Sequence, residues 1–128
     1  EGVLAETGYD LFGRMFKEDN LMPGLLRGID YLKQDESRHI AYGTYLLQSL
    51  VAQDERMYEV FNSQMDEMLP LIKEFMGGGE EASSEEPNPN LEYALRQFEL
   101  RKSKVARALG SGRENLTALA EEEFALNE

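Results

Sequence analysis

Apolar residues recur at spacings of three and four along most of the chain, a period typical of helices with one buried face. No stretch shows the sustained apolar and polar alternation of a half-buried strand. The pattern therefore predicts an all-α protein with four or five helices.

Two helices are predicted in the first part of the chain. The first runs from the start to about Lys17, where Asp19-Asn20 then interrupts it. The second begins near Pro23, a residue that the first turn of a helix tolerates, and continues to about Gln53. At roughly 30 residues it is longer than most globular helices. Helices of this length are common in bundles.

Caps and breakers delimit the later helices. Asp54 is the predicted cap of a third helix, which ends at Gly77-Gly78-Gly79. The acidic, Ser-rich segment at about 78–90 has the composition of a solvated linker. Asn90 is the predicted cap of a fourth helix, which stops at Gly110-Ser111-Gly112.

Each predicted helix carries one apolar stripe, which we expect to face inward. The tail at 111–128 carries a shorter stripe, which predicts a short helix. In chain order, the residues on these stripes are Leu4, Ala5, Gly8, Leu11 and Phe12; Leu25, Ile29, Leu32, Glu36, His39, Gly43, Leu47 and Leu50; Met57, Phe61, Met65, Met68, Ile72 and Phe75; Leu91, Ala94, Leu95, Phe98, Val105 and Leu109; and Leu116, Leu119, Ala120 and Phe124.

Charge and cysteine content restrict the possible partners. The chain has 13 Lys and Arg against 25 Asp and Glu, a net charge of −12, which disfavours nonspecific binding to nucleic acid or anionic lipid. With no Cys there is no disulfide framework and no thiolate metal site, so a reducing compartment and a cytoplasmic location are expected. No apolar run of about 18 residues predicts a membrane span.

Glu36 and His39 stand three positions apart and therefore share one helix face. Taken alone, such a pair is more often a hydrogen-bonded couple than a pair of metal ligands. Both lie on the apolar stripe, however, where a carboxylate needs a partner or a cation. Glu1 lines up with Ala5 and Phe12 on the first stripe in the same way. Two carboxylates and one imidazole could therefore converge between two antiparallel helices, as in half of a di-metal carboxylate bundle.

Two motifs carry a resemblance to a known family. Residues 1–9 (EGVLAETGY) and 35–43 (DESRHIAYG) resemble the C-terminal half of the ligand-binding oxidases related to the ribonucleotide reductase small subunit, in the ferritin-like superfamily. The resemblance continues through 22–25, 69–71 and 93–101. The Asp-Glu-x-Arg-His core is also similar to that of acyl-carrier-protein desaturases, but the Glu-Gly-Val-Leu-Ala opening favours the oxidases.

The resemblance implies a homodimeric oxidoreductase with a manganese and iron centre, or a di-iron one, that activates dioxygen beside a bound long-chain fatty acid. Residues 1–110 would be the C-terminal half of its ferritin-like di-metal domain, with Glu1, Glu36 and His39 as metal ligands. The other three ligands and an internal tyrosine–valine crosslink would lie on upstream helices. The chain opens at Glu1 without a Met, and we expect it to be part of a longer protein and inactive alone.

Other residues near the motifs are candidates for the surroundings of the metals. Ala5, Gly8 and Gly43 are small and could leave room for substrate or dioxygen, although close helix packing explains them equally well. Tyr9 is a further pocket candidate. Asp35 and Tyr42 are the predicted residues that orient the ligands, since a metal-bound imidazole usually has a partner on its second nitrogen. These four candidate pocket residues and two orienting residues complete the predicted site.

Three other functions stay open from the sequence. In a metal-free helical interaction module, Glu36 and His39 would only pair with each other and the apolar stripes would bind another chain. A radical-generating reductase subunit would need a tyrosine on a radical path. A desaturase would need a docking surface for its carrier protein.

Overall fold

The computed structural model describes residues 1–18, 21–77 and 87–125. Its elements, in chain order, are α1 (Leu4–Glu18), α2 (Pro23–Gln53), α3 (Arg56–Gly77), α4 (Pro89–Ala106), the 3-10 turn η2 (Arg113–Asn115) and α5 (Leu116–Ala125). No strand occurs in these ranges, so the predicted all-α class is confirmed. The predicted short helix in the tail is confirmed as α5.

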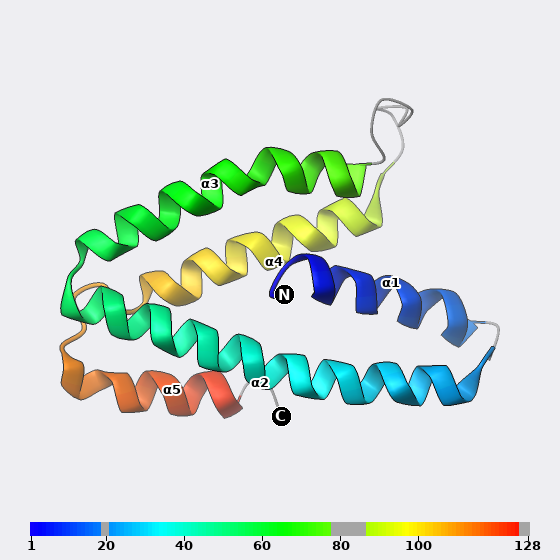
Figure 1. Ribbon diagram of the computed structural model, residues 1–128, viewed down its shortest axis with the longest axis horizontal. Coiled ribbons are helices and arrows are strands. Elements are labelled where there is room, and N and C mark those ends of the chain that lie inside the picture. The colour runs from blue at the N-terminus through cyan, green and yellow to red at the C-terminus, as the bar shows by residue number, and fades with distance from the viewer. Residues whose placement is uncertain (19–20, 78–86, 126–128) are drawn as a thin grey trace.

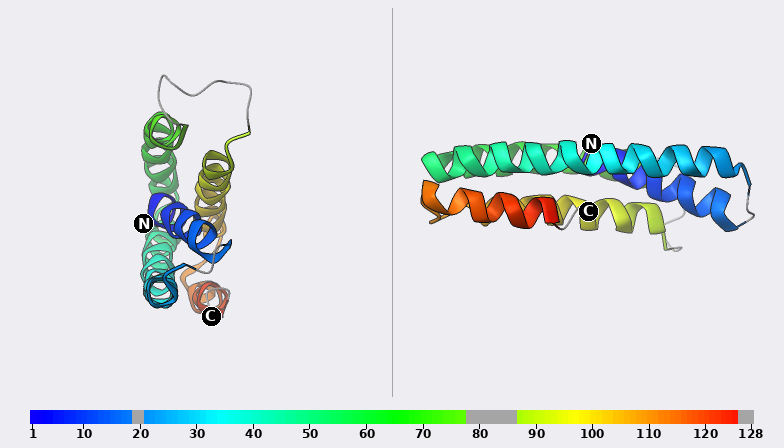
Figure 2. Two further views of the ribbon diagram at one scale, coloured as in Figure 1. Left: turned by 90° about the vertical axis from the view of Figure 1, so that its right-hand side faces the viewer. Right: turned by 90° about the horizontal axis from the view of Figure 1, so that it is seen from below.

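The long helix α2 runs along the length of an elongated bundle (Figure 1). α1 runs antiparallel to one half of α2, and α5 packs along its other half. α3 and α4 form an antiparallel pair, and α4 contacts both α1 and α2. The end-on view in Figure 2 shows that α1 crosses the space between α2 and the α3–α4 pair, so its N-terminal end reaches the middle of the bundle.

The bounds of α2 agree with the sequence prediction. Pro23 occupies the first turn, where its missing N–H costs no hydrogen bond, and the helix ends at Gln53 as predicted. The start of α3 also follows the prediction. The Asp54 carboxylate accepts a hydrogen bond from the backbone N–H of Arg56, the first residue of α3, at 3.1 Å.

The predicted cap of α4 was wrong by two residues. The cap is Asn88, whose Oδ1 accepts hydrogen bonds from the backbone N–H groups of Asn90 and Leu91. Pro89 takes the first helical position, which has no donor to lose. Of the predicted linker, residues 78–86 lie outside the described ranges and residues 89–90 belong to α4. α4 ends at Ala106, before the predicted stop, and the chain turns at Gly110 with a φ of 68°.

Two clusters of buried residues form the core. The first joins α2 to the end of α4 and the turn that follows it, through Val51, Val105 and Ala108. The second joins α3 to α4 through Ile72, Ala94 and Phe98. Val3 packs against the second cluster, which anchors the segment that precedes α1.

Many residues predicted to face inward are exposed instead. Periodicity identifies an apolar stripe, but it does not show whether another part of the same chain covers it. None of the helices in the described ranges combines the length and hydropathy needed to cross a bilayer. The side chain of Phe124 lies outside the described residues. The predicted inward residues that are exposed are Leu4, Phe12, Leu25, Leu32, His39, Leu50, Met68, Phe75 and Leu109.

Candidate metal centre

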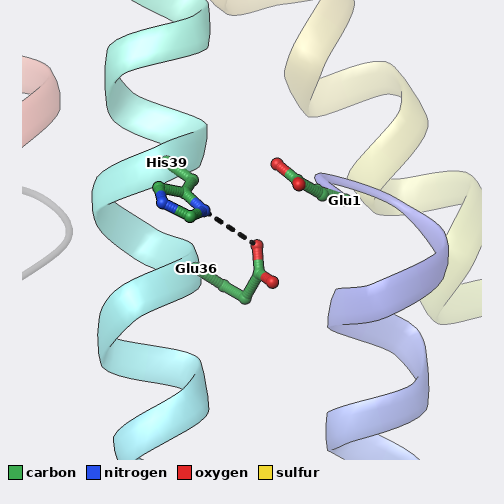
Figure 3. Close-up of side chains that lie close together, drawn as sticks. All are labelled: Glu1, Glu36 and His39. Carbon is green, nitrogen blue, oxygen red and sulfur yellow. Dashed lines mark ion pairs between the residues drawn. The ribbon is translucent and has the colours of Figure 1, made fainter.

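Glu36 and His39 lie midway along α2 and project from the same side of the helix (Figure 3). Their spacing of three residues places them one turn apart. His39 Nδ1 lies 4.0 Å from Glu36 Oε2, a separation that suits an ion pair but is too long for a hydrogen bond.

Glu1 reaches the same space from the segment that precedes α1. The prediction that it lies on the first helix was wrong, because α1 begins at Leu4 and residues 2–3 form a turn. The first bonds of this helix go to the Val3 carbonyl, which accepts from both the backbone N–H and the hydroxyl of Thr7. Gly2 is also a poor helix former. The side chain of Glu1 nevertheless points toward α2 (Figure 3).

The three side chains form one cluster. A ligand atom from each of Glu1, Glu36 and His39 lies within 4.8 Å of the other two. With metal bonds of about 2.1 Å, two ligand atoms on one ion lie at most about 4.2 Å apart, so a small inward shift of the exposed side chains is enough. Two carboxylates and one imidazole are a donor set that suits manganese or iron.

The burial of Glu36 gives the cluster a reason to hold a cation. The side chain of Glu36 is 20% exposed, and its Oε2 atom is fully buried without a hydrogen bond to any described residue. A buried carboxylate oxygen without a hydrogen bond is unfavourable, and a metal ion would satisfy it. The residues present therefore fit a divalent metal.

Tyr9 on α1 lies next to the acidic cluster. Burial raises the pKa of its phenol above the ordinary value of 10.0, and the nearby carboxylates, led by that of Glu36, raise it further. The phenol therefore stays protonated at neutral pH and is a neutral donor beside Glu36. Tyr9 lines a separate, more polar cavity between α1 and α2, together with Asp10, Arg14 and Lys33.

An apolar cavity of about 300 Å³ opens beside the cluster. Glu1 and His39 are among its lining residues, and Met65, Met68 and Phe98 supply apolar surface from α3 and α4. The apolar period predicts the α3 methionines only as core residues. Their contribution to a cavity depends on how α3 is placed, which periodicity does not give.

Of the small residues predicted to line a pocket, only Gly43 lies on this cavity; Ala5 and Gly8 do not. A Cβ atom added at Gly43 or Gly8 would meet no heavy atom within 4 Å beyond the neighbouring turns of its own helix, among the described residues. Close helix packing therefore does not explain these two glycines, and both leave open space.

The two predicted orienting residues have other surroundings. The Asp35 carboxylate accepts a hydrogen bond from Arg38 at 3.2 Å, and both side chains are exposed. Tyr42 is 58% exposed. Within the described ranges, neither residue makes a hydrogen bond to His39.

No protein-family model matches the sequence, and no solved structure matches the chain. A functional assignment therefore depends on the geometry of the cluster and on the resemblance of its motifs.

Proposed function

We propose that this chain forms the C-terminal half of a ferritin-like di-metal oxidase and supplies half of its metal ligands. The observation that carries the proposal is the convergence of Glu1, Glu36 and His39 beside an apolar cavity. Two upstream helices would contribute another Glu and another Glu-x-x-His. The full protein would be a cytoplasmic homodimer.

In this proposal Glu1, Glu36 and His39 hold the metals. A bound pair of manganese and iron ions would supply the electrons that reduce dioxygen. The two carboxylates offset the positive charge of the ions and can bind through one or two oxygens. Tyr9 keeps a neutral phenol beside Glu36 and can donate a hydrogen bond to that side of the cluster.

The apolar cavity is the proposed site of a long-chain fatty acid. Met65, Met68 and Phe98 give it an apolar surface, while Glu1 and His39 stand in its wall. An acyl chain would lie against the apolar residues with its head group toward the cluster. Without a metal, the carboxylates of the cluster would repel the carboxylate of the fatty acid. A metal bound there would attract it through its positive charge.

A metal-free helical interaction module is the second candidate, and one observation favours it. Leu71 and Phe75 on α3 are 63% and 74% exposed, which is unusual for large apolar side chains that are neighbours on one helix. In this case the apolar faces would bind another helical chain, and the cluster would have no ion.

Metal content of the full-length protein distinguishes the two candidates. We would express it with manganese and iron in the medium, measure both by elemental analysis and locate them by anomalous scattering. Glu36→Ala and His39→Ala are expected to lose metal. Glu74→Gln, which changes an exposed carboxylate on α3, is the matched control and should retain it. Unchanged metal content in both site variants would contradict the oxidase, and so would a wild-type protein that holds no metal after purification without chelator or imidazole.

A further inference from the structure

Arg101 on α4 contacts the turn that carries Glu1. Its Nε donates a hydrogen bond to the carbonyl oxygen of Gly2 at 3.2 Å, across 99 positions of the sequence. Its Nη2 donates to Gln97 Oε1, one turn earlier on α4, at 3.1 Å. The second bond fixes the plane of the guanidinium so that Nε faces Gly2. Arg101 and Gly2 both line the cavity beside the cluster.

Gly2 fits closely under the Arg101 side chain. A Cβ atom at this position would lie 2.9 Å from Arg101 Nε and 3.2 Å from its Cδ. Any larger residue would therefore have to displace Arg101. Gly13 on α1 is different, because a Cβ there would meet no atom within 4 Å among the described residues outside its own helix turns. The contact at Gly2 is thus specific to this turn.

Glu1 has no helix of its own to fix its position. It precedes α1, and its carbonyl accepts a long hydrogen bond, 3.3 Å, from the N–H of Glu6. The turn is held instead by Val3, which packs on the Ile72 and Phe98 cluster, and by Arg101. Of these two contacts, the one with Arg101 acts on the residue directly next to Glu1.

We propose that Arg101 is a positioning residue, which holds Glu1 in the metal centre by fastening the Gly2 carbonyl to α4. This inference rests on the proposed function and adds α4 to the elements that hold the metal ligands in place. An arginine suits the role because its rigid planar fork holds the donors to the carbonyl and to Gln97 in a fixed relative geometry, whereas the donors of a lysine rotate about its flexible stem. A carboxylate held in place loses less freedom when it binds a metal, so the metal is bound more tightly.

The test is Co²⁺ binding to the metal-free full-length protein, followed by its visible absorption. Arg101→Gln and Gly2→Ala should each weaken Co²⁺ binding by about 10- to 100-fold, the range found for residues that support metal ligands. Gly13→Ala is the matched control and should bind as the wild type does. Melting temperatures of all variants show whether the fold is kept, and Gly2→Ala displaces Arg101 without replacing any residue of α4.

A double-mutant cycle separates positioning from general stability. In a Glu1→Gln background, Arg101→Gln should cause no further loss of Co²⁺ affinity. The Glu1→Gln single variant and the Glu1→Gln, Arg101→Gln double variant should then give the same absorption spectrum. Additive losses, or wild-type affinity in Arg101→Gln, would overturn the role of Arg101 and leave the proposed metal site standing. A wild-type protein that does not bind Co²⁺ would instead overturn the proposed function itself, and the role of Arg101 with it.

Discussion

Gln48 on α2 donates a hydrogen bond from Nε2 to the carbonyl oxygen of Lys104 on α4, at 2.9 Å. The Gln48 side chain is completely buried, and its Oε1 has no donor among the described residues. One half of the amide therefore joins two helices, while the other half leaves an acceptor unsatisfied, at a cost of about 1–3 kcal/mol.

Gln48→Met should change the free energy of unfolding by less than about 1 kcal/mol, or increase it. Methionine has a similar length and removes the unsatisfied oxygen. The Lys104 carbonyl keeps a second donor, the backbone N–H of Arg107 at 3.3 Å. Gln48→Ala, which leaves a cavity, should be clearly less stable than Gln48→Met. Urea denaturation measures both, and a large loss in the methionine variant would contradict this account.

The cap of α4 should contribute measurably to stability. Asn88→Ala removes the acceptor for two backbone N–H groups, which typically costs about 1 kcal/mol. It also removes the hydrogen bond from Asn88 Nδ2 to the Met76 carbonyl at the end of α3. Asn88→Asp keeps the cap and loses only the second bond, so it should retain most of the stability. Thermal melting of the three proteins tests this order, and equal losses in both variants would show that the cap is unimportant.

The ion pair between Lys102 and Asp66 links α4 to α3. Lys102 Nζ lies 2.7 Å from Asp66 Oδ1, and the Lys102 side chain is 18% exposed. The hydrogen bond to Asp66 raises the pKa of Lys102 above its ordinary value of 10.5. Lys102→Met, which keeps the apolar stem, should cost less than about 1 kcal/mol at neutral pH.

The pH dependence of this pair has a definite sign. Because the pKa of Lys102 is higher in the folded protein, its stabilisation is fully present below pH 10.5 and is lost as the pH rises through the folded-state value. The difference in urea midpoint between the wild type and Lys102→Met should therefore be constant near neutral pH and shrink in strong alkali. A difference that grows with pH would contradict the pair.

The exposed apolar residues of α3 should cause self-association of the isolated chain. Leu71→Gln and Phe75→Gln together should reduce the apparent mass at a given concentration, because both side chains lie mostly in solvent. Each should change stability by less than about 0.5 kcal/mol. Light scattering coupled to size exclusion, over a range of concentrations, measures the effect. A wild-type chain that is a monodisperse monomer throughout would contradict it.

Helix positions could be predicted where local chemistry determines them. The bounds of α2 follow from Pro23 at its start and from the apolar period up to Gln53. The cap of α4 was misplaced because Asn88 and Asn90 are chemically equivalent, and only the position of Pro89 between them selects the first. Exposure was predicted poorly for residues such as Phe75, because the period of a helix does not show what packs against it.

The residues of the candidate site could also be predicted only in part from the sequence. Glu36 and His39 could be paired from their spacing alone, since three positions on a helix share a face. Glu1 was placed near them for the wrong reason, because it is not on α1. Arg101 was missed because its bond goes to a backbone carbonyl, and no side-chain pattern marks which residue will reach the main chain of another element.

About two thirds of the His39 side chain is open to solvent, and this has a practical consequence for anyone who purifies the chain. A chelator in the buffer, or the imidazole used to elute a tagged protein, would reach an ion held there without any opening of the fold. The metal occupancy of the cluster in such a preparation would then depend on the last dialysis buffer rather than on the growth medium.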